Sequence, residues 1–169
     1  MKKFIIIATL FLALAGLAQT NQYYSVGDLT ISLAPTVSFP MAAAKPSHAL
    51  YGFSYDTMYW MTAHTGAGLQ IGKRDLSESN TGYFDHYAAV TAYRITPLPN
   101  DFLFSRWSLN LSTGAESWIN TGAKGTFLGV GSEWAFTKNA RLFLNASEHF
   151  ETTAYESGSE LKAGVSWKF

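Results

Sequence analysis

Three residues of this chain have types and a spacing that could do chemistry: Ser147, His149 and Glu151. Because each lies two positions from the next, all three side chains would share one face of a β-strand. A hydroxyl, an imidazole and a carboxylate are the groups used in nucleophilic acyl transfer. Side chains two residues apart are separated along a strand, however, and this spacing does not by itself assemble a catalytic triad. We therefore treat these residues as an alternative catalytic set and expect that the protein is not an enzyme.

The other chemistry-bearing residues form no recognisable site. His64 lies among small residues, without a second His, Cys or carboxylate at the spacing that a metal ion requires. His86 beside Asp85 is expected to be solvated near a loop. Glycine-rich phosphate loops, nucleophile elbows and cofactor motifs are absent from the sequence. The sequence thus predicts no metal ion and no cofactor.

The element that would carry Ser147 and His149 belongs to a repeated pattern of alternating residues. The pattern is clearest at the C-terminus, where Leu161, Ala163, Val165, Trp167 and Phe169 alternate with smaller or charged residues. The length of such a segment matches the roughly 9–11 residues of a tilted strand that crosses a bilayer. Reading the chain with period two yields eight segments, at about 28–39, 47–55, 58–72, 83–95, 102–112, 126–136, 140–151 and 161–169.

These segments predict an all-β fold, an eight-stranded antiparallel up-and-down transmembrane β-barrel. Short links are expected at 56–57, 96–101 and 137–139, and longer loops at 40–46, 73–82, 113–125 and 152–158. Such alternation is typical of barrels with short periplasmic turns and longer extracellular loops. A secreted lipocalin-like barrel is the alternative, and it would have the reverse pattern, with apolar residues inside.

The N-terminus has the parts of a secretory signal peptide. Two lysines follow Met1, residues 4–18 are apolar with small residues at their end, and polar residues follow at 19–22. A membrane anchor would need roughly 18–20 apolar residues, more than this stretch provides. We predict a signal peptide at 1–18, with cleavage after Ala18 or, as a second choice, after Ala15. One barrel domain, 19–169, remains.

The composition limits what the mature protein contacts. Charged residues make up 14% of the chain and aromatic residues 15%, whereas about a quarter of the residues of a soluble domain are charged. Something other than water must therefore face much of the surface. The chain has 12 basic and 12 acidic residues, and loss of Lys2 and Lys3 removes two of the basic ones, so no nucleic-acid partner is expected. Without Cys, neither a disulfide nor a lipoprotein attachment site is possible.

The alternation also predicts which polar side chains face the barrel interior. An eight-stranded interior is only just wide enough for side chains to fill, so buried charges there must be paired. Pairing Phe136 with Ala140 across the 137–139 hairpin would bring Glu133 and Arg141 together. We expect a structural plug of ion pairs and hydrogen bonds, which disfavours a general porin. The predicted interior residues are His64, Gln70, Arg94, Arg106, Asn110, Glu133, Arg141, Asn145, His149, Glu160 and Lys162.

The terminal Trp167-Lys168-Phe169, with the eight segments and the signal peptide, resembles small eight-stranded outer-membrane barrels of the OmpX, Ail and OmpA-transmembrane-domain kind. The resemblance implies residence in the outer membrane of a Gram-negative bacterium, among its lipid and lipopolysaccharide. It also implies that the barrel assembly machinery recognises the last strand, through Leu161, Val165, Trp167 and Phe169. The implied function is a structural or adhesin-like role of extracellular loops 73–82 and 113–125, the second with Glu116, Trp118 and Lys124.

Some barrels of this kind are enzymes that trim or add acyl chains on lipid A. For Ser147, His149 and Glu151 the resemblance therefore implies, as the alternative function, a lipid A acyl hydrolase or transferase. The sequence around these residues does not resemble the catalytic motifs of those enzymes. A narrow channel is a third class. The extracellular ligand, the source organism or phage, and the oligomeric state are left open by the sequence.

Overall fold

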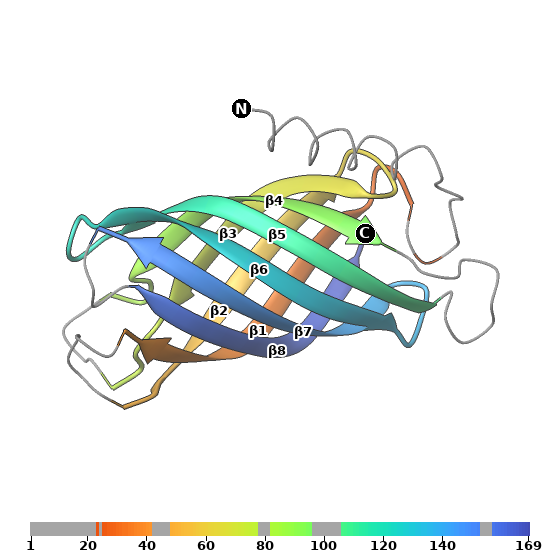
Figure 1. The fold of residues 1–169 in the computed structure, drawn as a ribbon. Helices are drawn as coiled ribbons and strands as arrows, with labels where there is room; N and C mark the ends of the chain where they lie inside the picture. The colour runs from red at the N-terminus through yellow and green to blue at the C-terminus, as the bar shows by residue number, and fades with distance from the viewer. Residues whose placement is uncertain (1–22, 24, 42–47, 78–81, 96–105, 153–156) are drawn as a thin grey trace.

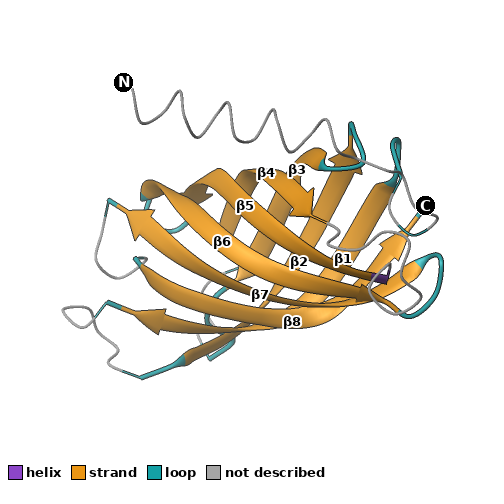
Figure 2. Cartoon of the chain, turned by 45° about the vertical axis from the view of Figure 1, so that its right-hand side comes forward, coloured by secondary structure: helices purple, strands orange, loops and turns teal. Residues whose placement is uncertain are grey.

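The computed structural model describes residues 23, 25–41, 48–77, 82–95, 106–152 and 157–169. The predicted signal peptide lies outside the described residues. Nearly all of the described chain is β-strand (Figure 2), and within it no helix is long and apolar enough to cross a membrane. The strands are β1 Leu29–Pro40, β2 Leu50–Trp60, β3 Thr65–Lys73, β4 His86–Ile95, β5 Trp107–Trp118, β6 Lys124–Ala135, β7 Ala140–Glu151 and β8 Gly158–Lys168.

The eight strands form one closed barrel in which each strand pairs antiparallel with the next (Figure 1). Closure comes from β1 and β8, and backbone hydrogen bonds between Leu29 and Phe169 extend this pairing to the C-terminus. The predicted eight-stranded antiparallel up-and-down barrel is confirmed. We call the end that holds Phe169 and the links 61–64, 96–106 and 136–139 the terminal end. The opposite end, with connections 41–49, 74–85, 119–123 and 152–157, is the loop end.

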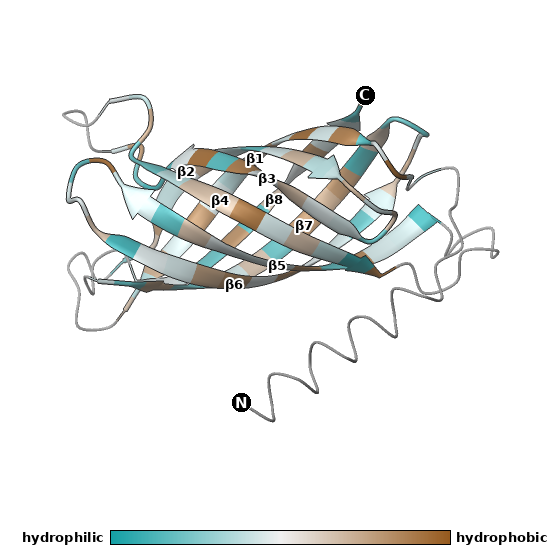
Figure 3. Cartoon of the chain, turned by 90° about the horizontal axis from the view of Figure 1, so that it is seen from above, coloured by the Kyte–Doolittle hydropathy of each residue, from teal (hydrophilic) through white to brown (hydrophobic). Residues whose placement is uncertain are grey.

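The strands alternate apolar residues outside with polar residues inside, as Figure 3 shows in bands of contrasting hydropathy along each strand. Leu33, Leu69 and Leu144 are 53%, 62% and 58% exposed on the outer face, whereas Ser54 and Arg94 are completely buried. Apolar side chains outside and a guanidinium inside are the reverse of a water-soluble barrel. The pattern is therefore inconsistent with the lipocalin-like alternative.

The turn predicted at 56–57 is wrong. Asp56 and Thr57 lie in the interior of β2, which continues to Trp60 before the turn at 61–64. Asp56 tolerates this position because its carboxylate faces the barrel interior and pairs with Lys162. His64, predicted to lie on a strand, belongs instead to this turn.

The predicted loop 113–125 is also wrong, because β5 continues to Trp118 and β6 begins at Lys124. Residues 113–125 were predicted to form a loop because the charged Glu116 was expected to face water. Glu116 and Trp118 are instead buried on the inner face of the barrel. The remaining connection, 119–123, is shorter than the terminal-end link 96–106, so loop lengths do not alternate as expected. In the predicted loop 73–82, Lys73 ends β3, and 78–81 lie outside the described residues.

Candidate functional site in the barrel interior

The terminal end of the interior is occupied by arginine side chains and their acceptors. Arg141 is fully buried, lies 3.5 Å from the Asp28 carboxylate and donates a 2.6 Å hydrogen bond to the Tyr23 carbonyl. Lys168 approaches the same carboxylate at 3.4 Å. Arg106, predicted to lie inside, precedes β5 and has its guanidinium 5.3 Å from the Tyr23 ring centroid. These groups close this end of the barrel with compensated charges.

Arg94 lies one layer further in. Its guanidinium is 3.3 Å from the centroid of the Trp60 indole and 3.9 Å from the Glu133 carboxylate. The predicted strand register is correct, because Ala135 pairs with Arg141 in β6 and β7. The predicted partner is not, since Glu133 lies beside Arg94 while Arg141 approaches Asp28. The register of a single hairpin could not show that the Glu133 and Asp28 carboxylates approach arginines of other strands across the closed barrel.

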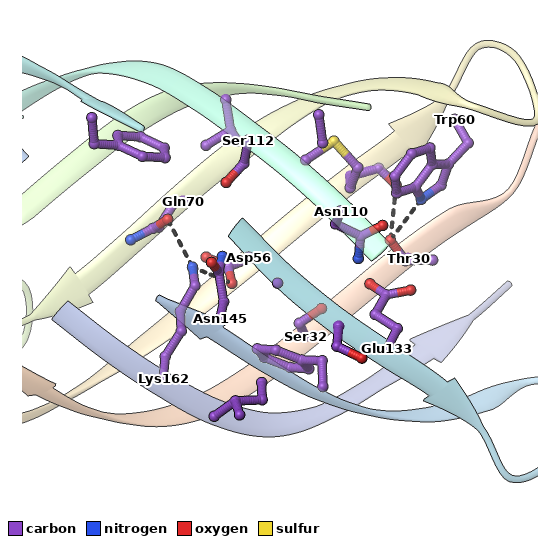
Figure 4. Close-up of a pocket in the computed structure, with 18 of the residues that line it drawn as sticks. Thr30, Ser32, Asp56, Trp60, Gln70, Asn110, Ser112, Glu133, Asn145 and Lys162 are labelled. Atoms are coloured by element: carbon purple, nitrogen blue, oxygen red, sulfur yellow. Dashed lines mark hydrogen bonds and ion pairs between the residues drawn. The ribbon is translucent and has the colours of Figure 1, made fainter. Parts of the chain in front are cut away.

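The middle layer holds a cavity of about 80 Å³ that polar and apolar side chains line together (Figure 4). The Lys162 ammonium lies between the Asp56 carboxylate, at 3.1 Å, and the Gln70 amide oxygen, at 3.0 Å. Asn110 and Asn145 line the cavity, as the sequence predicted for interior residues. A cavity of this size holds a few water molecules. Side chains fill the interior around it, as expected for an eight-stranded barrel.

The loop end holds a hydrogen-bonded chain of three buried side chains. The Ser147 hydroxyl lies 2.9 Å from Nε2 of His149, and Nδ1 of that imidazole lies 2.7 Å from a carboxylate oxygen of Glu116. An ionised carboxylate only accepts, so Nδ1–H donates to Glu116 and the serine hydroxyl donates to Nε2. The acidic group in the alternative catalytic set is therefore Glu116, and the sequence-based assignment of Glu151 to that role is wrong.

Glycines of β6 explain how β5 and β7 side chains meet across the strand between them. A Cβ at Gly125 would collide with the Glu151 carboxylate, and one at Gly129 would collide with Ser112 and crowd Asn145. Phe127, the inward residue between these glycines, stacks on the His149 ring at a centroid distance of 5.4 Å. The small residues leave room and the aromatic ring fixes the imidazole plane.

Glu151 completes a compact group of possible ligand atoms. One atom from each of Glu116, His149 and Glu151 lies within 4.8 Å of the others. The carboxyl groups of Glu116 and Glu151 are hydrogen-bonded to each other, and the Glu116 carboxylate also accepts from His149. The sequence missed Glu116, although its even spacing from Asn110 in the same strand could have placed it inside.

The remaining predicted site residues are distributed along the barrel. Nδ1 of His64 lies 2.7 Å from the Arg94 carbonyl at the terminal-end turn, and Glu160 accepts a 3.1 Å hydrogen bond from Ser38. The expectation that His86 is solvated is wrong. His86 is 2% exposed, hydrogen-bonded to Asp85 at 2.9 Å and packed on Trp118.

The C-terminal strand presents its apolar residues to the outside. Leu161, Trp167 and Phe169 are exposed and Val165 is partly exposed. The strand is not an open edge in the folded barrel, because β1 and β7 pair with its two sides. Any recognition of its backbone as an edge must therefore precede closure.

Comparisons with known proteins give a structural match alone. No family model matches the sequence, and no curated protein matches it. The N-terminal β-barrel domain of Pseudomonas aeruginosa OprF superimposes with a TM-score of 0.59 at 15% identity, covering 86% of this chain and 99% of that one. The outer membrane protein OprG from the same organism gives 0.53 at 9% identity, covering 89% and 99%. The chain has the fold of a small outer-membrane β-barrel.

A designed protein is matched equally well. A structure from the de novo design of transmembrane β-barrels superimposes with a TM-score of 0.58 at 11% identity, covering 85% of this chain and 97% of that one. Because a designed barrel has no natural partner, the likeness concerns the architecture, and function must be argued from this chain's own surfaces.

Proposed function

We propose that the protein is an integral outer-membrane barrel with a plugged interior, and that it acts through surface contacts of its loop end. Its working surface is then the loop end, which faces the outside of the cell. The role is non-enzymatic. The barrel itself serves as an anchor for that surface.

The observation that carries membrane residence is the arrangement of exposed side chains on the outer face. Aliphatic residues occupy the middle, and aromatic residues occupy both ends of the strands, as in barrels whose aromatic girdles mark the two membrane interfaces. The aliphatic belt includes Leu33, Leu69, Leu128, Val130 and Leu144. Tyr59, Trp134 and Trp167 lie near the terminal end, and Phe39, Tyr51, Tyr87 and Phe150 near the loop end.

Exposed apolar residues beyond the loop-end girdle support a surface contact. Leu76, Tyr83 and Phe84 lie in the connection 74–85, and Ile119 begins the connection 119–123. All four are exposed, and Tyr83 is 89% exposed. Large apolar side chains on loops outside the membrane are typical of protein interaction sites. The connection 74–85 therefore replaces the predicted loop 113–125 as the main contact surface.

The interior supports neither a channel nor lipid A chemistry. Arg94 and Arg141 are fully buried, and the cavity between the ends is about 80 Å³. Ser147 and His149 face the interior and are 9% and 3% exposed, away from the lipid-facing side of β7. An acyl chain in the outer leaflet would meet the opposite face of that strand. We propose that this hydrogen-bonded chain has no lipid substrate.

Attachment of intact cells tests the surface role. Cells producing the protein are compared with cells producing the triple variant L76S, Y83S and F84S, on host-cell monolayers. We expect attachment to fall to the level of cells without the protein, while K138S in the terminal-end link 136–139 leaves it unchanged. Unchanged attachment of the triple variant, with detergent sensitivity appearing only on deletion of the protein, would indicate a passive envelope role instead.

We also propose that the barrel assembly machinery recognises the C-terminal strand before closure. Phe169 is 73% exposed, and its backbone hydrogen bonds to Leu29 align the two strands that must meet. Removal of Phe169 is expected to reduce the amount of heat-modifiable, folded protein in the outer membrane. Normal assembly of the truncated chain would contradict this proposal, and F169W serves as the aromatic control.

A further inference from the structure

The loop-end cluster, which we define as Glu116, His149 and Glu151, places three possible metal ligands together. Their ligand atoms lie within 4.8 Å of one another, and two of them, His149 Nδ1 and a Glu116 oxygen, are 2.7 Å apart. Ligand atoms around a tetrahedral ion with bonds of about 2.1 Å are about 3.4 Å apart. Small side-chain rotations would therefore bring the three groups to bonding distance of one ion.

Two buried carboxyl groups in direct contact are a second, independent observation. The Glu116 side chain is 0% exposed, and its carboxyl group is hydrogen-bonded to that of Glu151. Two carboxyl groups share a hydrogen bond only when one of them keeps a proton, because two adjacent carboxylate ions away from water would destabilise the fold strongly. A cation between the two glutamates would take the place of that proton.

We propose that Glu116, His149 and Glu151 bind a divalent first-row transition-metal ion of the Zn²⁺ type at the loop end of the barrel. An imidazole nitrogen with carboxylate oxygens suits this class. Mg²⁺ and Ca²⁺ prefer oxygen ligands throughout, and soft ions prefer thiolates, which a chain without Cys lacks. Three protein ligands leave one position for water.

Ser147 is a positioning residue in this site. Without a metal ion, Nδ1–H of His149 donates to Glu116 and the serine hydroxyl donates to Nε2. When Nδ1 binds the ion through its lone pair, the proton moves to Nε2 and the hydroxyl becomes the acceptor. A hydroxyl can fill either role, so Ser147 fixes the ring in both states, as groups behind metal-bound histidines do.

Zinc binding by the full mature chain, refolded in detergent micelles and stripped with a chelator, tests the proposal. We expect saturable binding of one Zn²⁺ per chain by titration calorimetry, and visible absorption bands when Co²⁺ replaces it. E116Q and H149F should abolish saturable binding, and S147A should weaken it about tenfold or more. Two matched controls, E160Q and H64F, remove a carboxylate and an imidazole outside the cluster and should bind as wild type does.

The folded state of each variant is checked by its heat-modifiable mobility in electrophoresis. If E116Q or H149F does not fold, E151Q provides the same test, because Glu151 ends β7 and is only partly buried. Absence of Zn²⁺ binding by the folded wild type would overturn the proposal. So would undiminished binding by E116Q, H149F or E151Q. Neither result bears on attachment of cells, which depends on the connection 74–85.

Discussion

The two ends of the barrel interior carry opposite excesses of charge. The terminal end has more basic groups than carboxylates, and the loop end has more carboxylates than basic groups, within the part of the chain that the structure describes. The terminal-end groups are Arg94, Arg106, Arg141 and Lys168 with Asp28 and Glu133. The loop-end groups are Asp85, Glu116, Glu151 and Glu160 with Lys73 and Arg74.

The difference separates a structural end from an end that is suited to a ligand. Arg94 and Arg141 each approach a carboxylate, and Arg94 also stacks on an indole ring. At the loop end, the carboxyl groups of Glu116 and Glu151 contact each other. Buried charges at one end thus stabilise the closed barrel, whereas the two acidic groups at the other lie where a cation could bind between them.

Substitution of Arg94 is expected to reduce the free energy of unfolding most. R94M removes the guanidinium from beside Glu133 and leaves that carboxylate without its cation. Breaking a buried pair from one side costs about 3–5 kcal/mol. Urea unfolding of the barrel in lipid vesicles should show this loss in the free energy of unfolding. A loss below about 1 kcal/mol would show that the terminal end is not the stabilising one.

A charge on the outer face is expected to be nearly as costly. L144R places a guanidinium at the middle of β7, where Leu144 is 58% exposed to the proposed hydrocarbon. The expected destabilisation is about 2–4 kcal/mol at mid-membrane and about 0–1 near an interface. T126R, near the loop end of β6, is the matched control. Equal costs for the two variants, measured by the same unfolding experiment, would contradict a membrane-embedded outer face.

A substitution in the middle layer of the interior should reduce the stability of the barrel less. D56N removes the negative charge beside Lys162, whose ammonium keeps its 3.0 Å bond to Gln70 and can still donate to the amide oxygen at position 56 or to water in the cavity. A hydrogen bond to a charged group contributes about 1.5–3 kcal/mol, and water in the cavity reduces the loss. We therefore expect the free energy of unfolding to fall by about 1.5 kcal/mol or less. An increase in stability would assign this layer to the acid-rich end.

The smallest expected change in stability comes from replacing one glutamate by glutamine at each end of the interior. E133Q removes the negative charge beside Arg94 but keeps an oxygen that can accept from it, and Arg94 retains its contact with the Trp60 indole, so we expect a destabilisation of about 1 kcal/mol. E116Q removes a carboxylate from the acid-rich loop end and should leave the metal-free barrel as stable or more stable. Thermal unfolding in the presence of a chelator compares them. A change of the same sign in both variants would remove the contrast between the ends.

Local alternation was sufficient to predict most of the strands, whereas long-range neighbours were not predictable. The strand β7, 140–151, has its predicted bounds because alternation there continues to Glu151, with only Phe143 inside and Glu148 outside as exceptions. The predictions of a turn at 56–57 and of a loop at 113–125 were wrong because Asp56 and Glu116 face the interior, whereas acidic residues usually lie in exposed loops. The prediction of the acidic partner of His149 was wrong for another reason. Glu116 reaches His149 across β6, where Gly125 and Gly129 leave room for the side chains of the neighbouring strands. Alternation in single strands contains no information on such distances.

We propose that lipid surrounds the barrel while its charged groups lie inside. The chain has no native Cys, so single spin labels can be placed at L69C and L144C on the outer face, with the loop position Y83C as reference. Power saturation in lipid vesicles should show high collision rates with oxygen and low rates with a water-soluble nickel complex at the first two positions, and the reverse at the third. Equal nickel access at all three positions would contradict the account.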